Sequence, residues 1–370
     1  MNPFPTTLAS GEAFCNRKHE LKRLQYNFTH KIPTLLVSPR RYGKTSLALK
    51  AFEQIKWPYA HIDLYKALSE EDIARFLLTG IGQLLGKIEK TPKKLIKVAT
   101  EFFAGFQLKL AIEKIGLSVE FARKNKKPVD TILSALEKLD AYAKKIKVNV
   151  IIFLDEFQIV SEVAKNTAVE AAIREAVQKA SHVTYVFSGS NRHLIEEMFN
   201  DKKRPFYKLC DTITLGRIEE NDYKTYINKA AKKQWRQELK ENVLETIFKL
   251  TERHSYYVNK LCSLLCQKTG VPIENDVEYC WSEYVAESKS SIERELSLLT
   301  LNQRRLLIHL SNEEGIIEPF SKQYTQEWDI SATSSHRAMQ SLLEKDYILV
   351  DSKGQYCVLD PLIKKVLQEI

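Results

Sequence analysis

The chain has 370 residues, of which 44% are hydrophobic and 28% are charged, values typical of a soluble globular protein. This length predicts two or three domains, and no apolar run reaches the roughly 20 residues that a membrane-spanning helix needs. The six cysteines are dispersed and form no Cys-x-x-Cys pair, which favours free thiols in a reducing compartment over a metal site. We therefore expect a cytoplasmic protein that does not enter the membrane.

The net charge of +9 is unevenly distributed along the chain. Residues 87–147 carry fifteen Lys and Arg against seven Asp and Glu, a local excess of +8. Such a segment can attract nucleic acid or an acidic partner, although solvated lysines on helices explain it equally well.

A buried strand over Thr34–Val37 leads into a polar loop and then a helix that extends to Ile55. This order, with Gly-Lys-Thr in the loop, is typical of the Walker A phosphate-binding motif. Ser38 stands where the full pattern has its first glycine, and Gly-Lys-Thr alone is common by chance, so a plain turn with a solvated lysine stays open. The predicted nucleotide-binding residues of the loop are Ser38, Pro39, Arg40, Arg41, Tyr42, Gly43, Lys44, Thr45 and Ser46.

Two of these residues have specific predicted roles toward ATP and Mg²⁺. Lys44 would reach the β- and γ-phosphates, and the Thr45 hydroxyl would complete the Mg²⁺ shell. Downstream, Tyr59–Leu64 predicts a second strand, and Ser69 caps a helix that extends to about Leu85. The alternating runs Gly105–Ile112 and Gly116–Phe121 predict a β-hairpin before a helix that starts at Pro128.

The third predicted strand, Val148–Leu154, is almost continuously apolar, which indicates a strand buried on both faces. Asp155 and Glu156 follow it directly, in the Walker B arrangement. Asp155 would hold the Mg²⁺ shell, and Glu156 would orient or deprotonate the attacking water. Acidic capping of a helix N-terminus explains one of these carboxylates but not both.

Polar side chains also follow the fourth predicted strand, Thr184–Phe187, at Ser188, Ser190 and Asn191. In open α/β sheets, ligands bind beyond the carboxyl ends of the strands. Because three predicted strands end in polar or charged residues, the sequence predicts a nucleotide site at this edge.

The rest of the chain is mainly helical. Residues 218–288 have helical periodicity throughout. Three further helices and two strands then follow in the order of a winged helix-turn-helix. These five elements are Leu301–Leu310 with Thr300 as its cap, Ser321–Trp328, Ala332–Lys345, Tyr347–Val350 and Tyr356–Leu359. We therefore predict a P-loop core over 1–217 with a basic insertion at about 87–127, a helical lid over 218–290, and a winged helix over 291–370.

With these motifs in place, the chain resembles the archaeal-type ATPase family within the AAA+/STAND group of P-loop proteins. The resemblance covers essentially the whole length. It is carried by the segments Phe14–Arg17, Pro39–Ser46, Asp155–Gln158 and Phe187–Ser190, and by Asp360-Pro361-Leu362 after the wing. It implies an α/β fold with an AAA+-like parallel sheet, a helical lid and a carboxyl-terminal winged helix.

The resemblance also implies roles for individual residues. Adenine would be held partly by Phe14, Asn16 and Arg17, and Asn16 can cap the helix that follows. Ser190, rather than Ser188 or Asn191, would sense the γ-phosphate. The strands carrying the Walker A and B motifs would be adjacent in the sheet. A family arginine is absent after Tyr207, so Arg204 or Arg253 could supply the transition-state charge instead, the alternative for each being a structural or surface role.

Two functions remain open. The first is a Mg²⁺-dependent ATPase that acts on double-stranded DNA through the winged helix and the basic insertion, with hydrolysis coupled to a conformational change or assembly. The alternative is a slowly hydrolysing, nucleotide-dependent switch or scaffold that docks a protein partner or a second copy of itself. The third winged-helix helix offers few basic residues to a DNA groove, its candidates being Ser334, Ser335, Arg337, Gln340 and Ser341.

Overall fold

The computed structural model describes residues 3–369 apart from 107, 114–115, 122–126 and 352. The chain divides into two compact units, which are described separately. Arg17–Arg40 together with Lys44–Leu215 form what we call the sheet unit. Residues 1–16, 41–43 and 216–370 form the helical unit.

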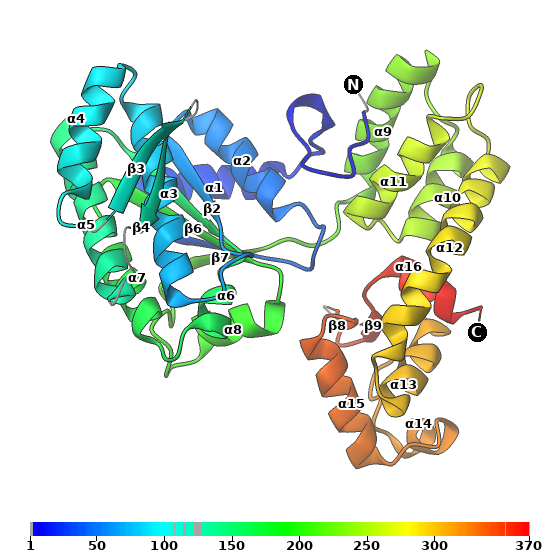
Figure 1. Ribbon diagram of the computed structural model, residues 1–370. Coiled ribbons are helices and arrows are strands. Elements are labelled where there is room, and N and C mark those ends of the chain that lie inside the picture. Colours follow the sequence, from blue (N-terminus) through cyan, green and yellow to red (C-terminus); the bar gives the residue numbers. More distant parts are fainter. Residues whose placement is uncertain (1–2, 107, 114–115, 122–126, 352, 370) are drawn as a thin grey trace. The chain divides into compact units, whose positions relative to one another are not determined.

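The sheet unit alternates strands and helices, as Figure 1 shows. Its elements are α1 (Lys18–His30), β1 (Thr34–Val37), α2 (Lys44–Ile55), β2 (Tyr59–Asp63), α3 (Glu70–Ile88), α4 (Pro92–Phe103), β3 (Leu108–Glu113), β4 (Gly116–Phe121), α5 (Pro128–Ile146), β5 (Val150–Asp155), α6 (Ile159–Val163), α7 (Ala168–Lys179), β6 (Val183–Gly189), α8 (Arg192–Asn200) and β7 (Asp211–Thr214).

Five of these strands form one parallel sheet in the order β2-β5-β6-β1-β7. Every residue of β5 is buried, which confirms the prediction from its almost continuous apolar run, and every residue of β6 is buried as well. The predicted adjacency of the two Walker strands is wrong. β6 lies between β1 and β5, because it pairs with β1 along one edge and with β5 along the other.

Two of the three local features predicted for the sheet unit are present. Ser69 caps α3 by accepting a hydrogen bond from the backbone N–H of Asp72 at 3.2 Å. β3 and β4 form the predicted antiparallel hairpin. Asn16 does not cap α1, however, because Arg17 occupies the N-cap position in a left-handed conformation and provides no side-chain cap.

The helical unit contains two predicted parts, the lid and the winged helix. Its elements are the short 3₁₀ helix η1 (Gly11–Ala13), α9 (Glu220–Trp235), α10 (Glu241–Thr251), α11 (Ser255–Leu265), α12 (Glu274–Ser297), α13 (Leu301–Ser311), α14 (Lys322–Glu327), α15 (Ala332–Glu344), β8 (Ile348–Val350), β9 (Tyr356–Val358) and α16 (Pro361–Leu367). The order of α13–α15 followed by an antiparallel β8–β9 pair confirms the predicted winged helix. The helix α16 was not predicted.

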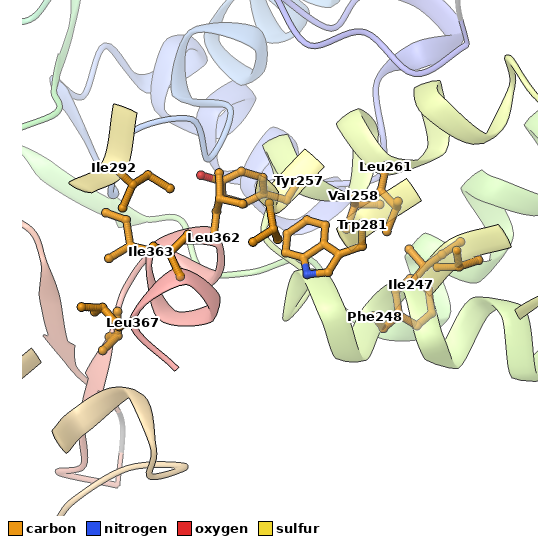
Figure 2. Packing of buried hydrophobic residues seen from close by; sticks show 14 of the residues in the cluster. Ile247, Phe248, Tyr257, Val258, Leu261, Trp281, Ile292, Leu362, Ile363 and Leu367 are labelled. Carbon is orange, nitrogen blue, oxygen red and sulfur yellow. The ribbon is translucent and has the colours of Figure 1, made fainter. Parts of the chain in front are cut away.

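One hydrophobic core runs through the helical unit from α9 to α16. Figure 2 shows part of it, with Leu362 and Ile363 of α16 beside Tyr257 of α11 and Ile292 of α12. α12 continues without a break past residue 290, where we placed the boundary between lid and winged helix. That boundary therefore stays a prediction, and the two parts are joined by shared packing.

Polar contacts reinforce this core where α16 begins. Asp360 caps α16 by accepting hydrogen bonds from the N–H groups of Leu362 and Ile363, and the Tyr257 hydroxyl donates to its carboxylate at 2.7 Å. Glu252 accepts from Arg217 at 2.8 Å and from Lys364 at 3.0 Å. None of the helices within the described ranges is long and apolar enough to cross a membrane.

Removing the Tyr257 hydroxyl should destabilise the helical unit. Tyr257 is 3% exposed, so Tyr257→Phe should cost about 1–3 kcal/mol because Asp360 loses a buried donor. Tyr279→Phe is the matched control, since Tyr279 also donates to a carboxylate, that of Glu283, but is 53% exposed. It should change stability by less than about 0.5 kcal/mol. Urea unfolding followed by tryptophan fluorescence tests this, and equal effects of the two changes would contradict it.

Candidate nucleotide site

The loop between β1 and α2 surrounds the ammonium group of Lys44. Its Nζ donates to the backbone oxygens of Ser38 at 2.9 Å and Pro39 at 3.2 Å, and the side chain is largely buried. Gly43 has φ of +92°, a conformation that favours glycine. Ser38 is fully buried and has no positive φ, so the missing first glycine does not strain this loop.

Asp155 lies at the carboxyl end of β5 and accepts hydrogen bonds from three different elements. Thr45 Oγ1 donates to Oδ2 at 2.8 Å, and His61 Nε2 lies 3.2 Å from the same oxygen. Ser188 Oγ donates to Oδ1. Burial alone would raise the pKa of the Asp155 carboxyl, but the hydrogen bonds from His61, Ser188 and Thr45 lower it below its usual value. The carboxylate is therefore kept ionised.

A carboxylate beside a threonine hydroxyl is a donor set that suits Mg²⁺. Among the described residues there is no group of three or more His, Cys, Asp or Glu that could hold a metal ion. Mg²⁺ at a nucleotide site does not require one, because waters and phosphate oxygens supply most of its ligands. Thr45 and Asp155 thus fit the predicted metal position, whereas no sequence pattern points to His61.

Glu156 is held by two donors on a single oxygen. Gln158 Nε2 and Ser190 Oγ each donate to Glu156 Oε2 at 2.6 Å. The backbone of Glu156 has φ of +53°, which is uncommon for a residue with a side chain and is often found at functional sites. The contact with Gln158 was not anticipated, although the residue lies in the Asp-Glu-Phe-Gln segment.

The three polar residues after β6 have separate partners. Ser188 contacts Asp155, Ser190 contacts Glu156, and Asn191 caps α8 by accepting from the N–H of Leu194 at 3.1 Å. Arg40 Nε in the loop donates to Ser190 Oγ at 3.4 Å. The side chain of Ser190 therefore connects the phosphate-binding loop to the Walker B glutamate, which favours it over the other two as the predicted sensor.

Arg204 makes structural contacts in the sheet unit. Its guanidinium donates to Ser161 Oγ at 2.6 Å and pairs with the buried carboxylate of Glu170 at 2.9 Å. Arg253, the other predicted arginine, donates to the backbone oxygen of Ile218 at 3.4 Å in the helical unit. Each contact supports the structural role that was the alternative for these two arginines. The catalytic role of Arg204 stays a prediction.

The residues predicted to contact adenine are divided between the two units. Phe14 and Asn16 belong to the helical unit, whereas Arg17 belongs to the sheet unit and pairs with Glu20 at 3.1 Å. Asn16 Oδ1 is buried and has no hydrogen-bond partner in the described part of the chain. The role of all three residues in nucleotide binding stays a prediction.

Two predicted loop residues have their contacts within the helical unit, to which residues 41–43 are assigned. The Arg41 guanidinium lies 4.4 Å from the centre of the Tyr256 ring, and the Tyr42 ring meets His254 edge-on at 4.9 Å. Burial, together with the charges of Arg217 and Arg41, lowers the pKa of His254 to about 3. His254 is thus a neutral packing partner of Tyr42.

Comparison with known proteins supports this description. A family model described as a probable winged helix domain matches residues 291–369. A Walker-type ATPase of Pyrococcus abyssi superposes with a TM-score of 0.70 at 16% identity, covering 99% of each chain. The ORC2 protein of Aeropyrum pernix, in ADPNP-ADP complexes, gives a TM-score of 0.59 at 12% identity, covering 95% of this chain and 93% of that one.

The chain has the predicted α/β fold with an AAA+-like parallel sheet. It ends in a winged helix, as the sequence predicted. No curated protein matches the sequence. At these low identities the similarity establishes the AAA+ fold alone, so the chemistry of this chain must be argued from its own residues.

The pairing of Arg204 with Glu170 leads to a stability prediction. Arg204→Ala should cost about 3–5 kcal/mol at neutral pH, because a buried carboxylate loses its charged partner. Burial already raises the pKa of Glu170, and Arg204 offsets part of that rise. The loss of stability should therefore shrink as the pH falls toward about 5, because Glu170 takes up a proton more readily in the folded variant than in the unfolded chain.

Urea unfolding at several pH values measures this effect. Glu170→Gln in the Arg204→Ala background should recover much of the lost stability, since it removes the uncompensated charge. Unchanged stability together with lost ATP hydrolysis would instead assign Arg204 to catalysis.

Proposed function

We propose that this protein is a Mg²⁺-dependent ATPase of the AAA+/STAND type. The observation that carries the proposal is the hydrogen-bonded set at the ends of three parallel strands, in which Thr45 contacts Asp155 and Ser190 contacts Glu156. Lys44 would bind the β- and γ-phosphates, and Thr45 and Asp155 would hold Mg²⁺, which neutralises developing phosphate charge when bound. The ADPNP and ADP in the ORC2 complexes are compatible with such a site.

The proposed reaction is hydrolysis of the γ-phosphoryl group. Glu156 would orient a water molecule and accept its proton as the oxygen bonds to the γ-phosphorus. The bond between that phosphorus and the bridging oxygen breaks, which yields ADP and phosphate. Ser190 would sense the γ-phosphate, since it already contacts both Glu156 and Arg40. Hydrolysis would drive a conformational change or assembly.

We further propose that double-stranded DNA binds to the basic segment 87–147, which includes the insertion. A groove of about 530 Å³ between α4 and α5 is lined by Lys94, Lys97, Lys138 and Lys145, together with Glu89 and Glu101. Lys94 pairs with Glu89, and Lys138 donates to backbone oxygens of residues 102 and 104. Lys97 and Lys145 have no carboxylate partner in the described ranges, so their charges are available to phosphates.

A second candidate function is a switch or scaffold that docks a protein through the winged helix. Residues 291–370 contain nine Lys and Arg against twelve Asp and Glu, a net charge of −3 that opposes DNA binding. On α15, Arg337 is exposed but Ser335 is buried, so Ser335 is not the groove-facing residue that we expected. Ile317 and Val350 are 58% and 44% exposed. An acidic surface with exposed apolar side chains suits a protein partner better than DNA.

Two substitutions separate nucleotide binding from turnover. Lys44→Ala should abolish ATP binding, whereas Lys50→Ala, also on α2, should leave it unchanged because Lys50 pairs with Glu53. Glu156→Gln should retain ATP but lower the turnover number by about 100-fold or more, since the carboxylate that takes the proton is gone. Calorimetric titration and phosphate release measure both. Unchanged turnover in either of these two site variants would contradict the assigned roles.

Salt titration of duplex binding distinguishes the DNA hypothesis from protein docking. Affinity should fall steeply with salt, and the double variant Lys97→Glu/Lys145→Glu should reduce the slope of log K against log salt by about two. Arg337→Glu is the control on α15 and should have little effect. ATPase activity with and without duplex or single-stranded DNA completes the test. No duplex binding near about 150 mM salt, with or without ATP, would contradict the DNA hypothesis and favour docking.

A further inference from the structure

The carboxylate of Glu156 has an asymmetric environment. Its Oε2 atom accepts hydrogen bonds from both Gln158 and Ser190, each at 2.6 Å. No described residue donates to its Oε1 atom, and this atom is not among the buried unpartnered ones. One oxygen is therefore fixed by the protein, while the other is accessible to a small molecule such as water.

Gln158 is itself firmly positioned. Gln158 is only 3% exposed. Its backbone oxygen accepts hydrogen bonds from the N–H groups of Ser161 at 2.9 Å and Glu162 at 3.2 Å in α6. Gly189 leaves the space for its amide, because a Cβ there would lie 2.5 Å from Gln158 Oε1. A side chain at residue 189 would displace the amide that holds Glu156.

The orientation of the amide follows from charge. Nε2 must face Glu156, because the reverse orientation would place the amide oxygen against a carboxylate oxygen. The cost of this arrangement is visible, since Gln158 Oε1 is buried and has no partner in the described part of the chain. A leucine of similar size would avoid that cost. Packing alone therefore does not explain a glutamine at this position.

The turn that carries Glu156 and Gln158 is held in place by the residue between them. Phe157, between them, is fully buried and packs edge-on against Phe187 and Phe206 at 4.8 and 5.1 Å. Its backbone N–H donates to the oxygen of Ser188 at 2.8 Å. Because the residue between them is fixed, the separation of the Glu156 and Gln158 side chains is set by the backbone.

We propose that Gln158 is a positioning residue for hydrolysis. Its amide holds Oε2 of Glu156 so that Oε1 is presented to the attacking water. This inference rests on the proposed ATPase function and adds a residue to that site. Gln158 contacts no reacting atom, so its effect is on turnover and not on nucleotide affinity. If the Gln158 amide instead kept Glu156 from accepting the proton, removing the amide would raise turnover.

The test compares Gln158→Glu and Gln158→Leu with the unmodified chain. Glutamate keeps the size but loses the donor, and leucine keeps the packing but loses the whole polar group. Each should lower kcat by about tenfold to hundredfold, the effect of losing one hydrogen bond to a charged group. The affinity for ADPNP with Mg²⁺, measured by calorimetry, should stay within about twofold, which also shows that the site is folded.

Thr184→Val is the matched control. Thr184 is buried on β6, and its hydroxyl has no partner among the described residues, so this change alters the polarity of the same sheet without touching Glu156. It should leave kcat unchanged. A third variant, Ser190→Ala combined with Gln158→Leu, should lose less than the product of the single effects, since both side chains act on one oxygen.

The outcomes separate this inference from the function on which it rests. An unmodified chain that binds ATP but releases no phosphate would overturn the proposed function and this inference with it. An active chain in which both Gln158 variants keep or raise kcat would overturn the positioning role alone. A parallel fall in kcat and ADPNP affinity would assign Gln158 to the general structure of the site and would also overturn it.

Discussion

The buried carboxylate of Asp155 is the constraint on which the candidate site depends. A charge that is 6% exposed is stable only where donors surround it, and Asp155 has donors from α2, β2 and β6. The same three contacts fix the positions of Thr45, His61 and Ser188 relative to β5. Satisfying one buried charge thus assembles the loop and two neighbouring strands into a single polar edge.

Much of this edge could be predicted from the sequence, because each part has a local signal. β1 leads into the loop that ends at Lys44, the apolar run of β5 ends before Asp155, and that of β6 ends before Ser188. Parallel strands bring these carboxyl ends to one side of the sheet. The order of the strands has no local signal. It depends on how the connections pack, so the position of β6 between the Walker strands was missed.

Other features were missed for the same physical reason. β7 has four residues, of which only Ile213 is buried, and it forms because β1 offers an edge and Asp211 pairs with Arg23. His61 reaches Asp155 only once β2 is known to pair with β5. The amide of Gln158 and the role of Arg204 likewise depend on partners distant in sequence. Residues that act through tertiary contacts cannot be assigned from spacing alone.

The packing and charge of the helical unit bear on which kind of partner the protein binds. Its lid helices and winged helix share one core, and Glu252 of the lid is joined to Arg217, which precedes α9, and to Lys364 of α16. A displacement of the lid helices would therefore be transmitted to the winged helix through direct packing. The winged helix is acidic, while the basic insertion lies in the sheet unit, so the two surfaces suit partners of opposite charge.

The most direct test of the account is a crystal structure of the chain with ADPNP and Mg²⁺. We predict the β- and γ-phosphates in the loop at Ser38–Ser46, with Mg²⁺ bound by Thr45 Oγ1 beside Asp155 and an ordered water beside Glu156. A nucleotide bound elsewhere, or a loop in which Lys44 still donates to the Ser38 and Pro39 oxygens in the presence of saturating ADPNP, would contradict it.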